Sequence, residues 1–136
     1  MHINENSSRE EILLAVKEVP SLFLIEFSGN PWAQPYINEA AKNAVRNSPF
    51  GFLYDFSDKP WAQPYIDEAA KRTSKKLPYA FLYNFSHKPW AQPYIEEAVK
   101  EIAMEHPKHF LQNLSDRFPQ GINWALFSLG GNNVSE

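Results

Sequence analysis

The sequence contains no cysteine, only five glycines and no long uninterrupted hydrophobic run. Without cysteine there is no disulfide, no thiolate metal site and no cysteine nucleophile. No apolar segment approaches the roughly 20 residues of a membrane-spanning helix, so we expect no membrane association. The few glycines form neither a phosphate-binding loop nor a nucleophile-elbow motif.

An excess of charge of either sign is also missing. Thirteen basic and sixteen acidic residues give a net charge of −3. Proteins that bind nucleic acid normally present a basic face, so this balance argues against a nucleic-acid partner. Residues 1–6 lack the basic and apolar regions of a secretory signal, and we therefore expect a cytoplasmic protein.

What the sequence does contain is an internal repeat. Aromatic residues make up 15% and hydrophobic residues 43% of the chain, which is typical of a globular protein. The heptapeptide Pro-Trp-Ala-Gln-Pro-Tyr-Ile occurs three times, beginning at Pro31, Pro60 and Pro89. A second series of prolines keeps the same spacing of 29 residues: Pro20, Pro49, Pro78 and Pro107. A fixed period of this length indicates a tandem array of structural repeats.

The prolines divide the chain into repeat units, which we expect to form one continuous domain over residues 1–136. The divisions are an N-terminal half-unit 8–19, full units 20–48, 49–77 and 78–106, a partial unit 107–117, a C-terminal cap 118–131 and a frayed tail 132–136.

The first half of each unit has the apolar pattern of a helix. Its fourth, fifth and eighth positions stay apolar in all four copies: Phe23, Leu24 and Phe27; Phe52, Leu53 and Phe56; Phe81, Leu82 and Phe85; Phe110, Leu111 and Leu114. Spacing of i, i+1 and i+4 marks one face of a helix, whereas a strand would preserve alternate positions. The leading proline suits the first helical turn, where its missing N–H costs nothing. We expect this stripe to form the core.

The second half of each unit is also predicted to be helical. In the second unit Trp61, Tyr65, Ile66 and Ala69 form an apolar stripe. A proline four residues after the start of the heptapeptide would disrupt a helix interior, so we favour a tight turn over 60–63 with the helix starting at Pro64, over a kinked helix. A serine closes the first helix in each copy and is expected to cap the next helix: Ser28, Ser57, Ser86 and Ser115.

The two ends are predicted to be helical caps. Overlapping capping boxes in residues 7–11 precede an apolar run in which Ile12, Leu13 and Val16 are expected to cover the first unit. A short helix over 121–127 should cover the other end through four side chains: Ile122, Trp124, Ala125 and Phe127. The fold class is therefore all-α, with tandem helix-turn-helix repeats stacked into a short α-solenoid between divergent caps.

Residues suited to chemistry are sparse. His106 and His109 lie three residues apart, but the only further ligands nearby are Glu101 and Glu105, which is an incomplete metal set. Paired carboxylates recur once per unit, as expected for a solvated helix face rather than for a single catalytic pair. We therefore expect no catalytic site, no metal site and no cofactor.

The positions that vary between copies predict a binding surface. On the first helix of each unit they lie away from the apolar stripe, and repeat proteins commonly contact ligands with such a face. The candidate partner-binding residues are Phe50, Tyr54, Asp55, Tyr79, Tyr83 and Asn84. A solvent face that has drifted in sequence is the alternative interpretation. The function predicted is a monomeric, non-catalytic interaction module for a protein or peptide.

The residues that stay identical between copies support a second hypothesis. A repeated ladder of tryptophan, glutamine and tyrosine would suit a carbohydrate or another small ligand: Trp32, Gln34, Tyr36, Trp61, Gln63, Tyr65, Trp90, Gln92 and Tyr94. Recent duplication explains their identity without a ligand, and large aromatic side chains at helical spacing usually fill the core.

Overall fold

The computed structural model describes residues 2–130, and within this range it contains nine α-helices, four 3₁₀ turns and no β-strand. The all-helical prediction is therefore confirmed. The chain divides into two compact units, Met1–Ala69 and Ala70–Glu136. None of the helices within the described range is long and apolar enough to cross a membrane.

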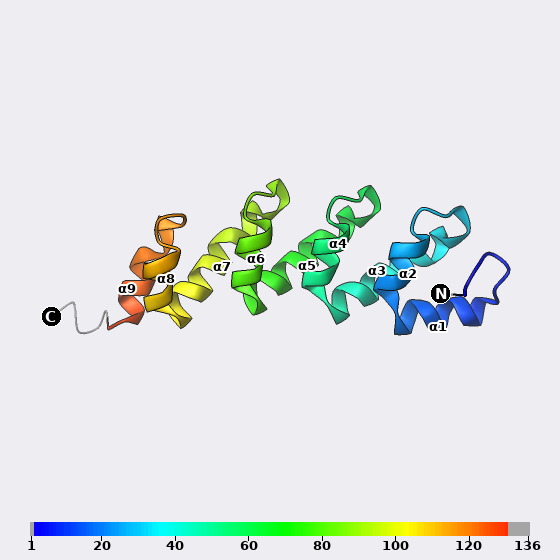
Figure 1. The fold of residues 1–136 in the computed structure, drawn as a ribbon, viewed down its shortest axis with the longest axis horizontal. Coiled ribbons are helices and arrows are strands. Elements are labelled where there is room, and N and C mark those ends of the chain that lie inside the picture. Colours follow the sequence, from blue (N-terminus) through cyan, green and yellow to red (C-terminus); the bar gives the residue numbers. More distant parts are fainter. Residues whose placement is uncertain (1, 131–136) are drawn as a thin grey trace. The chain divides into compact units, whose positions relative to one another are not determined.

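The first compact unit alternates short and long helices (Figure 1). In chain order its elements are α1 (Arg9–Glu18), α2 (Pro20–Phe27), η1 (Pro31–Ala33), α3 (Gln34–Asn47), α4 (Pro49–Phe56), η2 (Pro60–Ala62) and the beginning of α5 (Gln63–Lys76). The boundary between the two compact units lies inside α5. Helix α3 packs against α1, α2 and α4.

The second compact unit repeats this order. After the end of α5 it contains α6 (Pro78–Phe85), η3 (Pro89–Ala91), α7 (Gln92–Glu105), α8 (Pro107–Asn113), η4 (Pro119–Gly121) and α9 (Ile122–Ser128). Helix α7 packs against α6, α8 and α9.

The prolines explain where the helices begin. Proline stands at the first positions of α2, α4 and α6, where it costs no hydrogen bond. The Pro-Trp-Ala sequence forms a separate 3₁₀ turn in each full copy. The next helix starts at the glutamine, so Pro64 lies in the first turn of α5. The predicted tight turn is confirmed, with the helix beginning one residue earlier than expected.

The fourth copy keeps the structure of the others although it has lost their motif. Helix α8, turn η4 and helix α9 follow in the same order as α6, η3 and α7. The helix predicted over 121–127 is confirmed as α9. The seven residues of α9 compare with the fourteen of α7.

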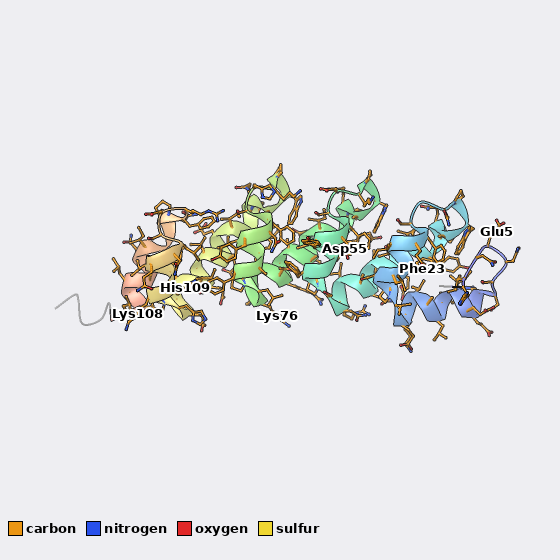
Figure 2. The ribbon with its side chains drawn as sticks, viewed as in Figure 1. Glu5, Phe23, Asp55, Lys76, Lys108 and His109 are labelled. Carbon is orange, nitrogen blue, oxygen red and sulfur yellow. The ribbon has the colours of Figure 1, made fainter. Side chains whose placement is uncertain are left out.

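The apolar stripe of the short helices forms the core. Phe23, labelled in Figure 2, is fully buried, as are Phe52, Phe81 and Phe110. The adjacent Leu24, Leu53 and Leu82 are fully buried as well. Two members of the predicted stripe, Phe27 and Leu111, are only half-buried. The long helices complete the core with side chains at i, i+3, i+4 and i+7: Ile37, Ala40, Ala41 and Ala44; Ile66, Ala69, Ala70 and Thr73; Ile95, Ala98, Val99 and Ile102.

Serine caps a helix at the start of the chain but does not do so after the short helices. Ser8 and Glu11 form the predicted capping box of α1, in which the Ser8 hydroxyl accepts from the Glu11 N–H at 3.1 Å. The prediction that Ser28, Ser57 and Ser86 cap the following helix is wrong. Each is the C-cap of its own helix, and the position directly before the next 3₁₀ turn is held by another residue: Asn30, Lys59 or Lys88. Ser115 also points back, donating its hydroxyl to the Leu111 carbonyl at 2.8 Å.

Two of the residues predicted to cover the ends face solvent. Ile12, Val16 and Ala125 are buried, but Leu13 is 37% exposed and Phe127 is 58% exposed. The predicted tail 132–136 and the end of the predicted cap lie outside the described residues.

Candidate functional site

An aromatic pair, of which Phe50 is half-buried and Tyr54 is exposed, lies on α4 of the first compact unit. Phe50 and Tyr54 stand one turn apart, and their rings stack at 6.0 Å between centroids with 30° between planes. Tyr54 is 66% exposed, and the neighbouring Asp55 (labelled in Figure 2) is exposed too. This helix therefore presents a broad aromatic surface beside a carboxylate.

A second aromatic pair occupies the same positions on α6 of the second compact unit. Tyr79 and Tyr83 stack at 6.4 Å with 24° between planes. Two histidines adjoin the Tyr79 ring, with centroid distances of 5.9 Å to His106 and 5.1 Å to His109. Burial raises the pKa of Tyr79 above its ordinary value of 10.0, and Tyr83 raises it further.

The six predicted partner-binding residues thus form one group in each compact unit. Tyr54, Asp55 and Tyr83 are exposed, whereas Phe50, Tyr79 and Asn84 are half-buried. The Asn84 amide nitrogen donates to the Ala80 carbonyl of the same helix at 2.8 Å. The sequence prediction missed His106 and His109 as neighbours of Tyr79, since they come from the following copy.

The tryptophans of the predicted ladder pack inward against the short helix of their own copy. Trp61 lies 6.1 Å from Phe52 and 5.2 Å from Phe56, measured between ring centroids. Equivalent contacts join Trp32 to Phe23 and Phe27, and Trp90 to Phe81 and Phe85. Each indole is half-buried. Tryptophan therefore joins the turn to the helix before it.

The glutamines of the ladder close the loop between the two helices of each copy. The Gln63 amide nitrogen donates to the Ser57 carbonyl at 3.1 Å and to the Lys59 carbonyl at 3.0 Å. Gln34 and Gln92 make the same two bonds in their copies. One acceptor is the carbonyl of the serine that ends the short helix, and a helix end leaves such carbonyls without a helical partner. The other is the carbonyl just before the 3₁₀ turn, which also accepts the N–H of the alanine in that turn. Both amide donors are used within the protein.

The tyrosines of the ladder have more varied surroundings. The Tyr65 hydroxyl donates to the Asn38 side-chain oxygen, which belongs to the preceding copy, and burial raises the pKa of Tyr65. Tyr36 lines a pocket of about 500 Å³ with Arg9, Leu13, Pro35 and Glu39. Tyr94 is half-buried. A carbohydrate-binding role for the ladder stays a prediction, and its tryptophans and glutamines have structural contacts in every full copy.

A pocket in the second compact unit was not anticipated from the sequence. It has a volume of about 460 Å³ and lies between the α5–α6 connection and the C-terminal turns of α7. Its lining residues are Lys75, Lys76, Leu77, Pro78, Tyr79, Ala80, Glu101, Ile102, Glu105 and His106. A sign in the sequence was available, because Glu101 and Glu105 stand 29 residues after the basic residues Arg72 and Lys76.

Within residues 2–130 there is no group of three or more histidine, aspartate or glutamate side chains placed to hold a metal ion. Stacked phenol rings and a charged pocket are suited to binding through shape, apolar contact and charge.

No protein-family model, no curated protein and no solved structure matches this chain.

Proposed function

We propose that this chain is a non-catalytic interaction module that binds a protein or peptide through the exposed aromatic pairs of its short helices. The observation that carries the proposal is the exposure of Tyr54 and Tyr83, at 66% and 54%, at the same position of successive copies. Large aromatic groups held at a surface are typical of protein-binding patches.

Stacking favours a binding role because it holds each tyrosine in place. Phe50 supports Tyr54, and Tyr79 supports Tyr83, one helical turn earlier in each case. A tyrosine has only two side-chain torsions, so it offers a large contact area at a low cost in conformational entropy. Its hydroxyl remains available for a hydrogen bond to a partner backbone.

The repeated copies are proposed to stack as an α-solenoid, which would present the aromatic pairs at regular intervals. Contacts between successive copies within each compact unit support this arrangement. In the first, the Tyr65 hydroxyl donates to Asn38, 27 residues earlier. In the second, the Arg117 guanidinium donates to the Ser86 hydroxyl at 3.3 Å, 31 residues earlier. Both spacings are close to the repeat period.

The proposal is tested with a Tyr54→Ala/Tyr83→Ala variant. Wild type and variant are immobilised, proteins from a native lysate are captured, and bound proteins are quantified by mass spectrometry. We expect the proteins retained by wild type to be lost from the variant. Both side chains are exposed, so the circular dichroism spectrum and melting curve should stay close to those of wild type.

A matched control removes exposed apolar side chains elsewhere. Leu14 and Leu126 are 59% and 50% exposed, on α1 and α9. A Leu14→Ala/Leu126→Ala variant should retain the same proteins as wild type. Equal capture by all three chains, or equal loss from both variants, would show that the tyrosines are not the binding surface.

A further inference from the structure

The 460 Å³ pocket of the second compact unit has the size of a ligand site and is lined by both apolar and charged side chains. Pockets that bind small ligands or side chains typically measure about 300–1,000 Å³. Leu77, which is 50% exposed, and Tyr79 supply apolar surface. The charged side chains that line the pocket are placed asymmetrically.

The charges of opposite sign come from different helices. Lys75 and Lys76 end α5 (Lys76 is labelled in Figure 2), whereas Glu101 and Glu105 belong to the last two turns of α7. Among the described residues of this pocket, no ion pair joins either lysine to either glutamate. A ligand that carries one positive and one negative group could therefore pair with the glutamates and with the lysines at the same time.

On the α7 side of the pocket, the two carboxylates lie near a helix C-terminus. A helix C-terminus carries a partial negative charge, which cations stabilise and carboxylates do not. The last turn of α3 contains Arg46 and that of α5 contains Lys75 and Lys76, but the last turn of α7 contains no basic residue. Its carboxylates therefore stand at an end that is already negative. A cation from a partner would relieve this repulsion.

Tyr79 adds a second attraction for a cation at the same place. Tyr79 lines the pocket together with His106, and its ring contacts the rings of Tyr83, His106 and His109. The face of a tyrosine ring attracts a lysine or arginine head group placed within about 6 Å of its centre. The methylene groups of such a side chain would cover the exposed apolar surface of Leu77.

We propose that this pocket receives a peptide segment that carries a basic side chain next to an acidic one. The basic side chain enters between Glu101, Glu105 and Tyr79, and the acidic side chain meets Lys75 and Lys76. This inference rests on the proposed function, since Tyr79 links the pocket to the aromatic pair and one bound peptide would contact both.

The experiment selects random peptides displayed on phage against the immobilised full chain. We expect the retained peptides to be enriched in a basic residue close to an acidic one. A synthetic peptide of the most enriched sequence should bind a Glu101→Lys/Glu105→Lys variant at least about tenfold more weakly, because an attraction becomes a repulsion. Selection against that variant should replace the basic residue by an acidic one.

A matched control separates the pocket from the general charge of the chain. Glu18 and Glu96 are exposed and do not line the pocket. A Glu18→Lys/Glu96→Lys variant has the same change in net charge and should bind the peptide within about twofold of wild type. Equal weakening in both variants would overturn the inference.

One further measurement tests whether weaker binding comes from misfolding. Another distinguishes failure of the proposed pocket from failure of the proposed aromatic surface. A Glu101→Gln/Glu105→Gln variant removes the charges with little change of shape, and it should also weaken binding if circular dichroism shows it folded. Selected peptides that need Tyr83 but show no charge preference would refute the pocket while leaving the aromatic surface intact. If the wild-type chain retains no peptide, both proposals are wrong.

Discussion

Replacing Gly121 by alanine tests the packing of the fourth copy. Gly121 is the last residue of η4, and its equivalents in the other three copies are the buried alanines Ala33, Ala62 and Ala91. The substitution would therefore make the fourth copy more like the others. Its backbone angles, φ −89° and ψ −7°, are accessible to alanine, so any cost comes from contacts alone.

The contacts leave no room for a methyl group. A Cβ atom at this position would lie 2.4 Å from Phe110 Cζ and 2.6 Å from Val99 Cγ1. Both neighbours are fully buried, so neither can swing into solvent. Overpacking of a well-packed core costs about 1–3 kcal/mol, and we expect Gly121→Ala to lower the free energy of unfolding by that amount.

A compensating change should recover part of the loss. The residues 29 and 58 positions before Val99 are Ala70 and Ala41. The two preceding long helices therefore have alanine where α7 has valine, and the turns η2 and η3 have alanine where η4 has glycine. Val99→Ala alone should cost about 1.6 kcal/mol, from two methyl groups at about 0.8 kcal/mol each. In the double variant the new methyl group occupies vacated space. We expect it to be less destabilised than the sum of the single variants by at least about 0.5 kcal/mol.

The assay is urea denaturation followed by circular dichroism for wild type, both single variants and the double variant. A stable Gly121→Ala variant would refute the packing argument outright. If instead the single variant is destabilised and the two substitutions are additive, Val99 is not the obstructing group and Phe110 alone must be.

Three further predictions concern stability. Phe81→Ala removes a fully buried ring and should cost about 3–5 kcal/mol in urea denaturation; an unchanged midpoint would contradict the core assignment. Gln63→Glu keeps the side-chain size but loses both hydrogen bonds to the Ser57 and Lys59 carbonyls, and should cost about 1–3 kcal/mol by the same assay. A neutral result would show that the loop closes without these bonds. Burial raises the pKa of Tyr65 and Tyr79, so the stability that their neutral hydroxyls contribute is present below pH 10.0 and is lost as the pH rises further. In thermal melts above about pH 9, the melting temperature of a Tyr65→Phe/Tyr79→Phe variant should therefore fall less with pH than that of wild type.

The sequence by itself determined the helices and most of the core. Spacing of apolar residues in four copies distinguished helix from strand, because a helix face recurs every three to four residues and a strand face every two. Proline at a first turn and the Ser8–Glu11 capping box marked helix starts, because both act within a single turn. Comparing copies within one chain strengthened the apolar spacing and the proline positions, which recur every 29 residues.

Only the tertiary structure decided which polar groups meet. The three repeated glutamines read as a ligand ladder in the sequence, but their donors reach carbonyl groups four and six residues earlier across a turn. Asn43 has no distinctive sequence context, yet it is buried and donates to the Val16 carbonyl 27 residues away. Such contacts depend on how two helices approach each other, which local periodicity does not encode.

The same reason separates the two parts of the candidate site. Tyr54 and Tyr83 were predicted as surface residues, since position on a helix is enough to place a side chain away from the core. The pocket beside Tyr79 required Lys75 from one helix and Glu101 from another to face a common space. Glu101 and Glu105 stand 29 residues after the basic residues Arg72 and Lys76, so the change of charge is visible in the sequence. Only the folded chain shows that lysines and glutamates line one cavity.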